Sequence, residues 1–130
     1  MKTIATTTAA AVATATIALI GVAPAHADTA APFDEVTTTT HSEGDIYHIT
    51  PSDYGRTMGA DVLSSVLSSE PSNDILHAML NFGIPQRDNI YSQIACHAIF
   101  APTKSQWNIE TWRETMPNLS SMVESRCNPR

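Results

Sequence analysis

Cys96 and His97 are adjacent, and they form the closest pairing of chemically versatile side chains in the sequence. A thiol beside an imidazole is the composition of a cysteine nucleophile with its general base. However, the residues from Asp88 to about Ile99 have apolar side chains at helical spacing, and Asp88 or Asn89 can cap this helix. Adjacent side chains on a helix diverge by about 100°, so these two cannot form the nucleophile–base hydrogen bond with each other. We therefore predict no catalytic thiol.

His97 can still act as a base or a ligand without Cys96. Gln93 lies one helical turn before it, at the edge of the apolar face, where it could fix the tautomer of the imidazole. The alternative is a histidine that is hydrogen-bonded at the edge of the core. A zinc site would also need His41, His48 or His77, and no two of these histidines have the spacing of a zinc motif. We predict no metal and no cofactor.

Motifs of hydrolytic enzymes are absent from the sequence. There is no H-E-x-x-H, no G-x-S-x-G and no H-D calcium-loop pattern. Carboxylates are plentiful, with 13 Asp and Glu residues. A small secreted hydrolase that uses His97 with a carboxylate therefore stays as an alternative function, although we assign no catalytic residue.

The first 27 residues have the features of a secretory signal peptide. Lys2 is the positive start, Ile4 to Val22 is apolar, and Ala25-His26-Ala27 supplies small residues at positions −3 and −1. A retained membrane anchor needs about 20 strongly apolar residues, and threonines dilute this run. We predict cleavage after Ala27, secretion to the extracellular space or cell envelope, and no membrane span after cleavage.

The chain that remains after cleavage, residues 28–130, is acidic. It has six basic and 13 acidic residues, a net charge of −7. Nucleic acid and anionic membrane surfaces reward clustered Lys and Arg, so neither is an expected partner. The acidic residues are scattered, which favours a role in solubility over a specific cationic partner.

Export favours a disulfide between the two cysteines of the chain, Cys96 and Cys127. Closing a loop of this length should stabilise the fold by roughly 3 to 4 kcal/mol. On the predicted helix, Cys96 faces the element that carries Cys127, which we expect to be a last helix with Pro117 in its first turn. A free thiol and an intermolecular bridge are the alternatives.

A β-hairpin is predicted near the start of the exported chain. Val36 to Thr40 and Ile46 to Thr50 are rich in β-branched residues and flank a Ser-Glu-Gly-Asp turn. Alternatively, the Thr37–Thr40 run is a flexible linker that carries O-glycans. Residues 28–44 are interpreted as a partly flexible segment with the first strand.

Two more helices precede the one that carries Cys96. Their apolar residues recur at helical spacing, and Gly83 and Pro85 end the second helix. The predicted buried residues are Val62, Leu63, Val66, Leu67, Ile75, Leu76, Met79 and Leu80. The fold class is therefore α+β: a small single domain in which an N-terminal β-hairpin packs on three or four short helices, with one disulfide. Residues 45–130 would form the disulfide-linked domain, and we expect a monomer.

Two tryptophans, Trp107 and Trp112, lie between Pro102 and Pro117. Tryptophan can stack on sugars or on an arginine of a partner. In an irregular loop, as we expect here, tryptophan more commonly seals a small core, and we favour this role for both. Glu110 and Arg113 are three residues apart and could pair in a helical turn.

The same region carries a resemblance to a known family. The residues that carry it are Q-x-x-C-H from Gln93, Lys104, W-N-I-E-x-W-R from Trp107, C-N-P from Cys127 and, upstream, T-P-x-x-x-G-R from Thr50. Together these resemble a family of small exported actinobacterial proteins with a domain of unknown function. Glu114 stands where the family commonly has a proline.

This resemblance implies export and a cystine-linked domain, and it implies no established activity. We therefore predict a secreted binding or interaction module for a protein or an envelope ligand, with a purely structural envelope protein as a further alternative. The candidate binding residues are Arg56, Gln93, His97, Trp107, Asn108, Trp112 and Arg113.

Overall fold

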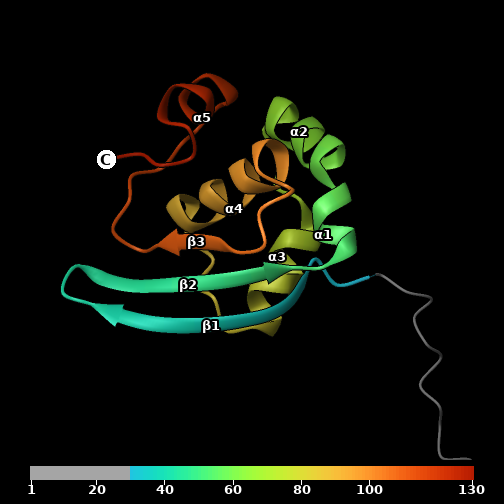
Figure 1. Cartoon of the computed structure of the whole chain (residues 1–130). Helices are drawn as coiled ribbons and strands as arrows, with labels where there is room; N and C mark the ends of the chain where they lie inside the picture. Colours follow the sequence, from blue (N-terminus) through green and yellow to red (C-terminus); the bar gives the residue numbers. More distant parts are fainter. Residues whose placement is uncertain (1–29) are drawn as a thin grey trace, which may run out of the picture.

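A three-stranded antiparallel sheet forms one side of the molecule (Figure 1). Strands β1 (Phe33–His41) and β2 (Gly44–Pro51) form the predicted hairpin, and β3 (Trp107–Glu110) adds to the free edge of β2. Side chains alternate along β2, where Tyr47, Ile49 and Pro51 are buried. Because alternate residues of β2 are buried, the hairpin has one apolar face, and burial of this face by the rest of the chain stabilises it.

The computed structural model describes residues 30–130. The predicted signal peptide, residues 1–27, lies outside the described residues. The helices cover one face of the sheet (Figure 1), and their bounds are α1 (Asp53–Thr57), α2 (Gly59–Ser68), α3 (Asn73–Asn81), α4 (Asp88–Phe100) and α5 (Leu119–Ser125). No helix in this part of the chain is both long enough and apolar enough to cross a membrane.

Helix α4 is the centre of the fold. It contacts β3 and α2, and every residue from Ser92 to Ala98 is buried. The approach of α2 is close, since a Cβ on Gly59 would lie 2.6 Å from the carbonyl oxygen of Ala98. Packing from several sides explains why burial extends beyond the half of the helix that its apolar pattern predicts.

The Cys96–Cys127 disulfide is confirmed. It joins α4 to the chain just after α5, with a Cα–Cα distance of 5.5 Å. Cys127 lies two residues beyond the last helix and not within it, and Pro117 precedes the N-cap Asn118 instead of occupying the first turn. The bridge still fastens α5 to α4, as the helical orientation of Cys96 predicts.

Several local predictions were wrong. The segment of strand β3 was expected to be an irregular loop, and α4 has Arg87 as its N-cap in place of Asp88 or Asn89. Leu67 and Leu80 were expected to be buried, but each is 67% exposed. Helices this short need tertiary contacts to fix which face is buried, so periodicity alone misjudged them.

Candidate functional site

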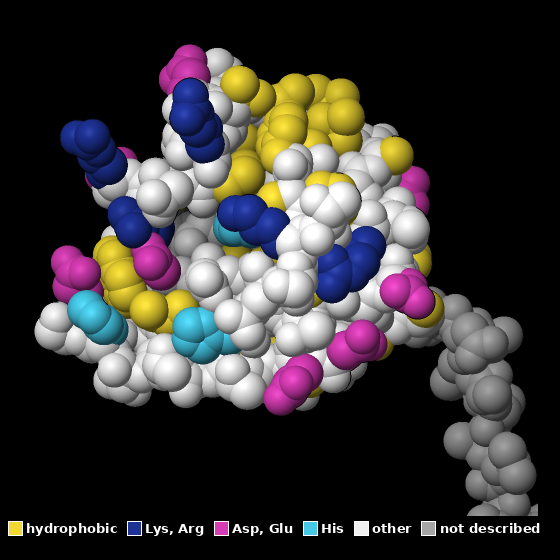
Figure 2. Space-filling model, in the orientation of Figure 1, with side chains coloured by type: hydrophobic (Ala, Val, Ile, Leu, Met, Phe, Trp, Pro, Cys, Tyr) yellow, Lys and Arg dark blue, Asp and Glu magenta, His cyan; other side chains and the backbone are white. Residues whose placement is uncertain are grey.

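A polar cleft lies between β3, α4 and the end of α5, with a volume of about 440 Å³. We call it the polar cleft; its lining residues are Gln93, His97, Lys104, Gln106, Asn108, Glu110, Ser125, Arg126, Cys127 and Asn128. Figure 2 shows a hollow on this face with Lys and Arg side chains around it and a histidine inside. The cations stand out in a chain whose formal net charge is −6.

His97 lies in the wall of this cleft and is 7% exposed. Its Nδ1 is 2.7 Å from the main-chain carbonyl oxygen of Gln93. Burial lowers the pKa of His97, the bond to this carbonyl raises it, and the charge of Lys104 lowers it further. The net shift is downward, so the imidazole is neutral at pH 7.

The neutral tautomer of His97 follows from that contact. A carbonyl oxygen can only accept, so Nδ1 carries the proton and Nε2 presents a lone pair. Nε2 has no hydrogen bond to another described residue, and no buried side-chain nitrogen or oxygen among the described residues lacks a partner. Nε2 is therefore accessible, and it is a hydrogen-bond acceptor for a group in the cleft.

Gln93 fixes this tautomer through its main-chain oxygen, and its side chain makes other contacts. Its Nε2 donates to the main-chain oxygen of Glu110 at 2.9 Å, and its Oε1 accepts from the main-chain N–H of Glu110 at 3.0 Å. Nε2 also donates to the main-chain oxygen of Asn89. The amide thus pairs with β3 as a neighbouring strand would, and it holds the strand against α4.

We expect Q93L to lower the free energy of unfolding by about 2 to 3 kcal/mol. The variant leaves the N–H of Glu110 unpaired in a part-buried position, which carries a desolvation cost, and it removes one of the two donors of the Glu110 C=O, which also accepts from the main-chain N–H of Arg113. Urea unfolding measures the change. Q86L is the matched control, because Gln86 is exposed and donates one bond, to the main-chain oxygen of Leu76. Equal losses in the two variants would contradict the role of Gln93.

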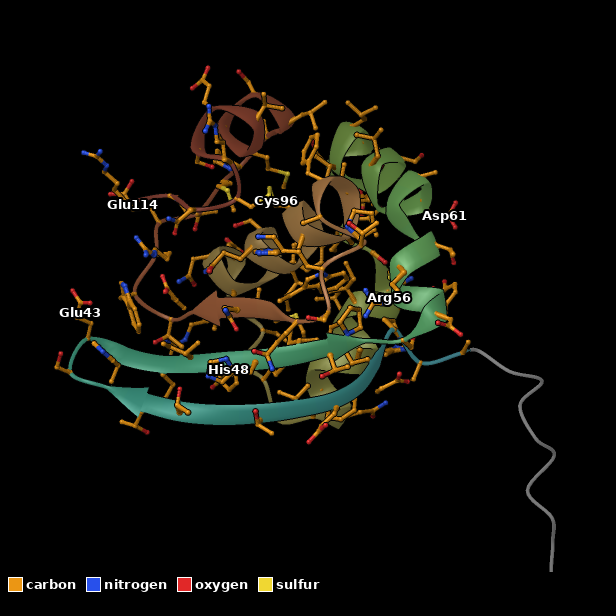
Figure 3. The ribbon with its side chains drawn as sticks, viewed as in Figure 1. Glu43, His48, Arg56, Asp61, Cys96 and Glu114 are labelled. Atoms are coloured by element: carbon orange, nitrogen blue, oxygen red, sulfur yellow. A yellow bond between two sulfur atoms is a disulfide. The ribbon has the colours of Figure 1, made fainter. Side chains whose placement is uncertain are left out.

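Asn108 reaches the cleft from β3 and is oriented by His48 on β2 (Figure 3 labels His48). His48 Nδ1 is 2.7 Å from Asn108 Oδ1, and His48 Nε2 is 2.8 Å from Thr39 Oγ1. Since the amide oxygen of Asn108 faces His48, its NH2 group is available to the cleft. His48 was considered only as a metal ligand in the sequence, and its cross-strand position opposite Asn108 is what reveals this contact.

Arg56 and Arg113 do not line the cleft, but each holds a part of its wall. Arg56 donates to the main-chain oxygens of Pro102 and Lys104, at 2.9 and 2.6 Å (Figure 3). Arg113 pairs with Glu110 and donates to the main-chain oxygen of Pro129 at 3.2 Å. Both arginines therefore position residues of the cleft.

The two tryptophans lie in different surroundings, and neither lines the cleft. Trp107 is 0% exposed, and its Nε1 donates to the main-chain oxygen of Ala101. Trp112 is half-buried beside the hairpin, with its ring centroid 5.8 Å from that of His41. Trp107 thus belongs to the core, and Trp112 packs on the hairpin.

Lys104, Arg126 and Asn128 were not proposed as site residues from the sequence. Lys104 and Asn128 belong to the quoted motifs, so proximity to Cys96-His97 and Cys127 was the available signal. Arg126 has a positive φ of 52°, in the left-handed region, just after α5. This turn carries its side chain to the cleft, and no periodic pattern predicts such a turn.

The fold and the cleft define a small, disulfide-linked α+β domain with a polar surface site. The chain belongs to the family described as Protein of unknown function (DUF2599), which matches residues 33–130. Searches of curated proteins and of solved structures gave no match. Within residues 30–130, no group of three His, Cys, Asp or Glu side chains is placed to hold a metal ion. The actinobacterial origin implied by the resemblance stays a prediction.

Proposed function

We propose that this chain is an exported binding module that holds an anionic, hydroxyl-bearing group of an extracellular or envelope ligand in the polar cleft. One observation carries the proposal: an acidic chain gathers two cations, Lys104 and Arg126, around a neutral histidine acceptor. Amide side chains complete the lining, from Gln106, Asn108 and Asn128.

Each part of the cleft has a separate task in this proposal. Lys104 and Arg126 attract the negative charge, and the guanidinium can donate two parallel hydrogen bonds to one anionic group. Nε2 of His97 accepts a hydrogen bond from a hydroxyl of the ligand. The disulfide and Arg56 hold the walls before binding, which reduces the entropy that binding costs.

Binding is better supported than the alternative of hydrolysis by His97 with a carboxylate. Nδ1, the atom that such a carboxylate would contact, is held by the carbonyl of Gln93. Glu110 lines the same cleft but pairs with Arg113. A purely structural envelope role predicts no saturable ligand, and the following experiment separates it from binding.

Titration with inorganic phosphate, followed by NMR of backbone amides, should give saturable shifts around Lys104, Asn108 and Asn128. At pH 7 sulfate should bind several-fold more weakly, because inorganic phosphate carries a hydroxyl that can donate to the neutral His97 and sulfate carries none. Sulfate affinity should rise as the pH falls through the lowered pKa of His97, since the imidazolium then donates from Nε2 and adds a positive charge.

The K104A/R126A variant should weaken phosphate binding by about tenfold or more, since both cations of the cleft are lost. R87A/R130A removes the same charge at exposed positions outside the lining of the polar cleft, so it should retain the affinity. An equal loss in the two variants, or shifts that do not saturate, would mean that phosphate senses only the overall charge, and the proposal would fail.

A further inference from the structure

An apolar groove adjoins the polar cleft. It has a volume of about 300 Å³, and we call it the apolar groove. Its apolar wall consists of Phe100, Ala101, Met122 and Val123. The groove and the cleft share four lining residues, His97, Lys104, Arg126 and Cys127, so they lie directly beside each other.

The groove leaves large apolar side chains uncovered. Phe100, the last residue of α4, is 48% exposed, and Val123, within α5, is 56% exposed. Figure 2 shows hydrophobic side chains extending upward from the hollow, toward the part of the molecule where Figure 1 places α5 and α2. An apolar surface beside Lys104 and Arg126 matches a ligand with an apolar part and an anionic end.

An extended peptide fits this depression poorly. Such peptides commonly add as a strand to an open sheet edge, where main-chain hydrogen bonds hold them. Here the outward-facing N–H and C=O of Glu110 on β3 are already paired with the side chain of Gln93. An alkyl chain needs no main-chain partner, and the groove offers it apolar contacts.

We propose, on the basis of the proposed function, that the ligand is a single-chain lipid with a phosphate monoester head group. The head group lies in the polar cleft, against Lys104, Arg126 and the Nε2 acceptor of His97. The first part of the chain lies in the apolar groove, against Phe100 and Val123. A phosphate monoester supplies both the negative charge and, in its monoprotonated form, a hydroxyl donor.

Calorimetric titration with butyl, hexyl and octyl phosphate tests this, each below the concentration at which it aggregates. A fully buried methylene improves affinity by about fourfold, and in this half-open groove we expect about twofold for each. Octyl phosphate should therefore bind at least about tenfold more tightly than butyl phosphate. Octyl glucoside and octyltrimethylammonium should bind much more weakly, since neither has an anionic head.

Two surface variants distinguish binding in the apolar groove from non-specific binding to exposed apolar side chains. F100S/V123S should keep the affinity for inorganic phosphate, which has no alkyl chain, and lose the dependence on chain length. L67S/L80S removes two apolar side chains that are more exposed still but lie outside the groove, so it should behave like the parent chain. The melting temperature of each variant shows whether its fold is impaired. If F100S/V123S is impaired, the single variants F100S and V123S are tested in its place.

The outcomes separate the two proposals. If phosphate and the alkyl phosphates bind with equal affinity, the lipid inference is wrong and the proposed anion site stands. If octyl glucoside matches octyl phosphate, the anionic head group contributes nothing to lipid binding and the lipid inference is wrong, and the phosphate titration alone decides on the anion site. Octanoate binding as tightly as octyl phosphate would overturn the phosphate head group. If none of these anions binds, both proposals fail together.

Discussion

Removing the disulfide, as C96A/C127A, is expected to lower the free energy of unfolding by about 3 to 4 kcal/mol. The bridge closes a loop with a sequence separation of 31 residues, and its main effect is to restrict the unfolded chain. Domains of this size typically have total stabilities of about 5 to 15 kcal/mol. The loss is thus a large share of the total, and denaturant unfolding of oxidised parent and variant measures it.

The loss of stability should also be concentrated in one part of the molecule. Helix α5 has Met122 as its only buried residue, so little besides the bridge fastens it to α4. Hydrogen exchange in C96A/C127A should therefore accelerate most in Leu119–Ser125, while β1, β2 and α4 keep their protection. Parent protein reduced with dithiothreitol should match the variant. Uniform acceleration across the sheet and α4 would show that the bridge supports the whole core and not α5 alone.

Replacing Trp107 by alanine, W107A, is expected to cost about 3 to 5 kcal/mol. The side chain is fully buried, its ring lies 6.5 Å from that of Phe33 in an edge-to-face arrangement, and its N–H donates to Ala101. Truncation leaves a large cavity in the core, and it removes one of the two donors of the Ala101 carbonyl, which also accepts from the main-chain N–H of Lys104. Urea unfolding measures the cost, and the unfolded fraction is expected to be appreciable even without denaturant.

W112A is the matched control for this prediction. Trp112 has the same side chain in the same segment, but it is half-buried and packs on the hairpin beside His41. Its truncation should cost about 1 kcal/mol. If W112A destabilises the domain as much as W107A, burial does not decide the role of these tryptophans. If the two sites are independent, the W107A/W112A double variant should lower the free energy of unfolding by the sum of the two single changes.

The hairpin and the disulfide were predictable because neither prediction requires knowledge of the tertiary structure. Strand residues around Ser42-Glu43 pair with near neighbours, and two cysteines allow one internal pairing. Strand β3 was not predictable in the same way. Its four residues form a strand because β2 offers an edge and Gln93 supplies a partner from α4. Both conditions are tertiary contacts, which the local sequence of β3 does not reveal.

The candidate site was harder to predict than the fold. His97 was identified from its neighbours in the sequence, but the cations that give the cleft its charge come from a loop and from a left-handed turn, at Lys104 and Arg126. Hydrophobic periodicity carries no information on where such segments end. The assignment of Arg56 and Arg113 as wall-holding residues likewise rests on bonds to main-chain oxygens, which side-chain types do not reveal.

The amide of Gln93 also gives the sheet two unlike edges. At β3 the main-chain groups of Glu110 are occupied, so another chain cannot pair with them. At β1 the outer edge has no neighbouring strand in the described part of the chain, and its exposed residues are four threonines, Asp34, Glu35 and His41. If crowded copies of this domain pair strand to strand, they should therefore join through β1 and stop at dimers. Fibril growth needs two open edges on each copy, and within residues 30–130 only the β1 edge is open along its whole length.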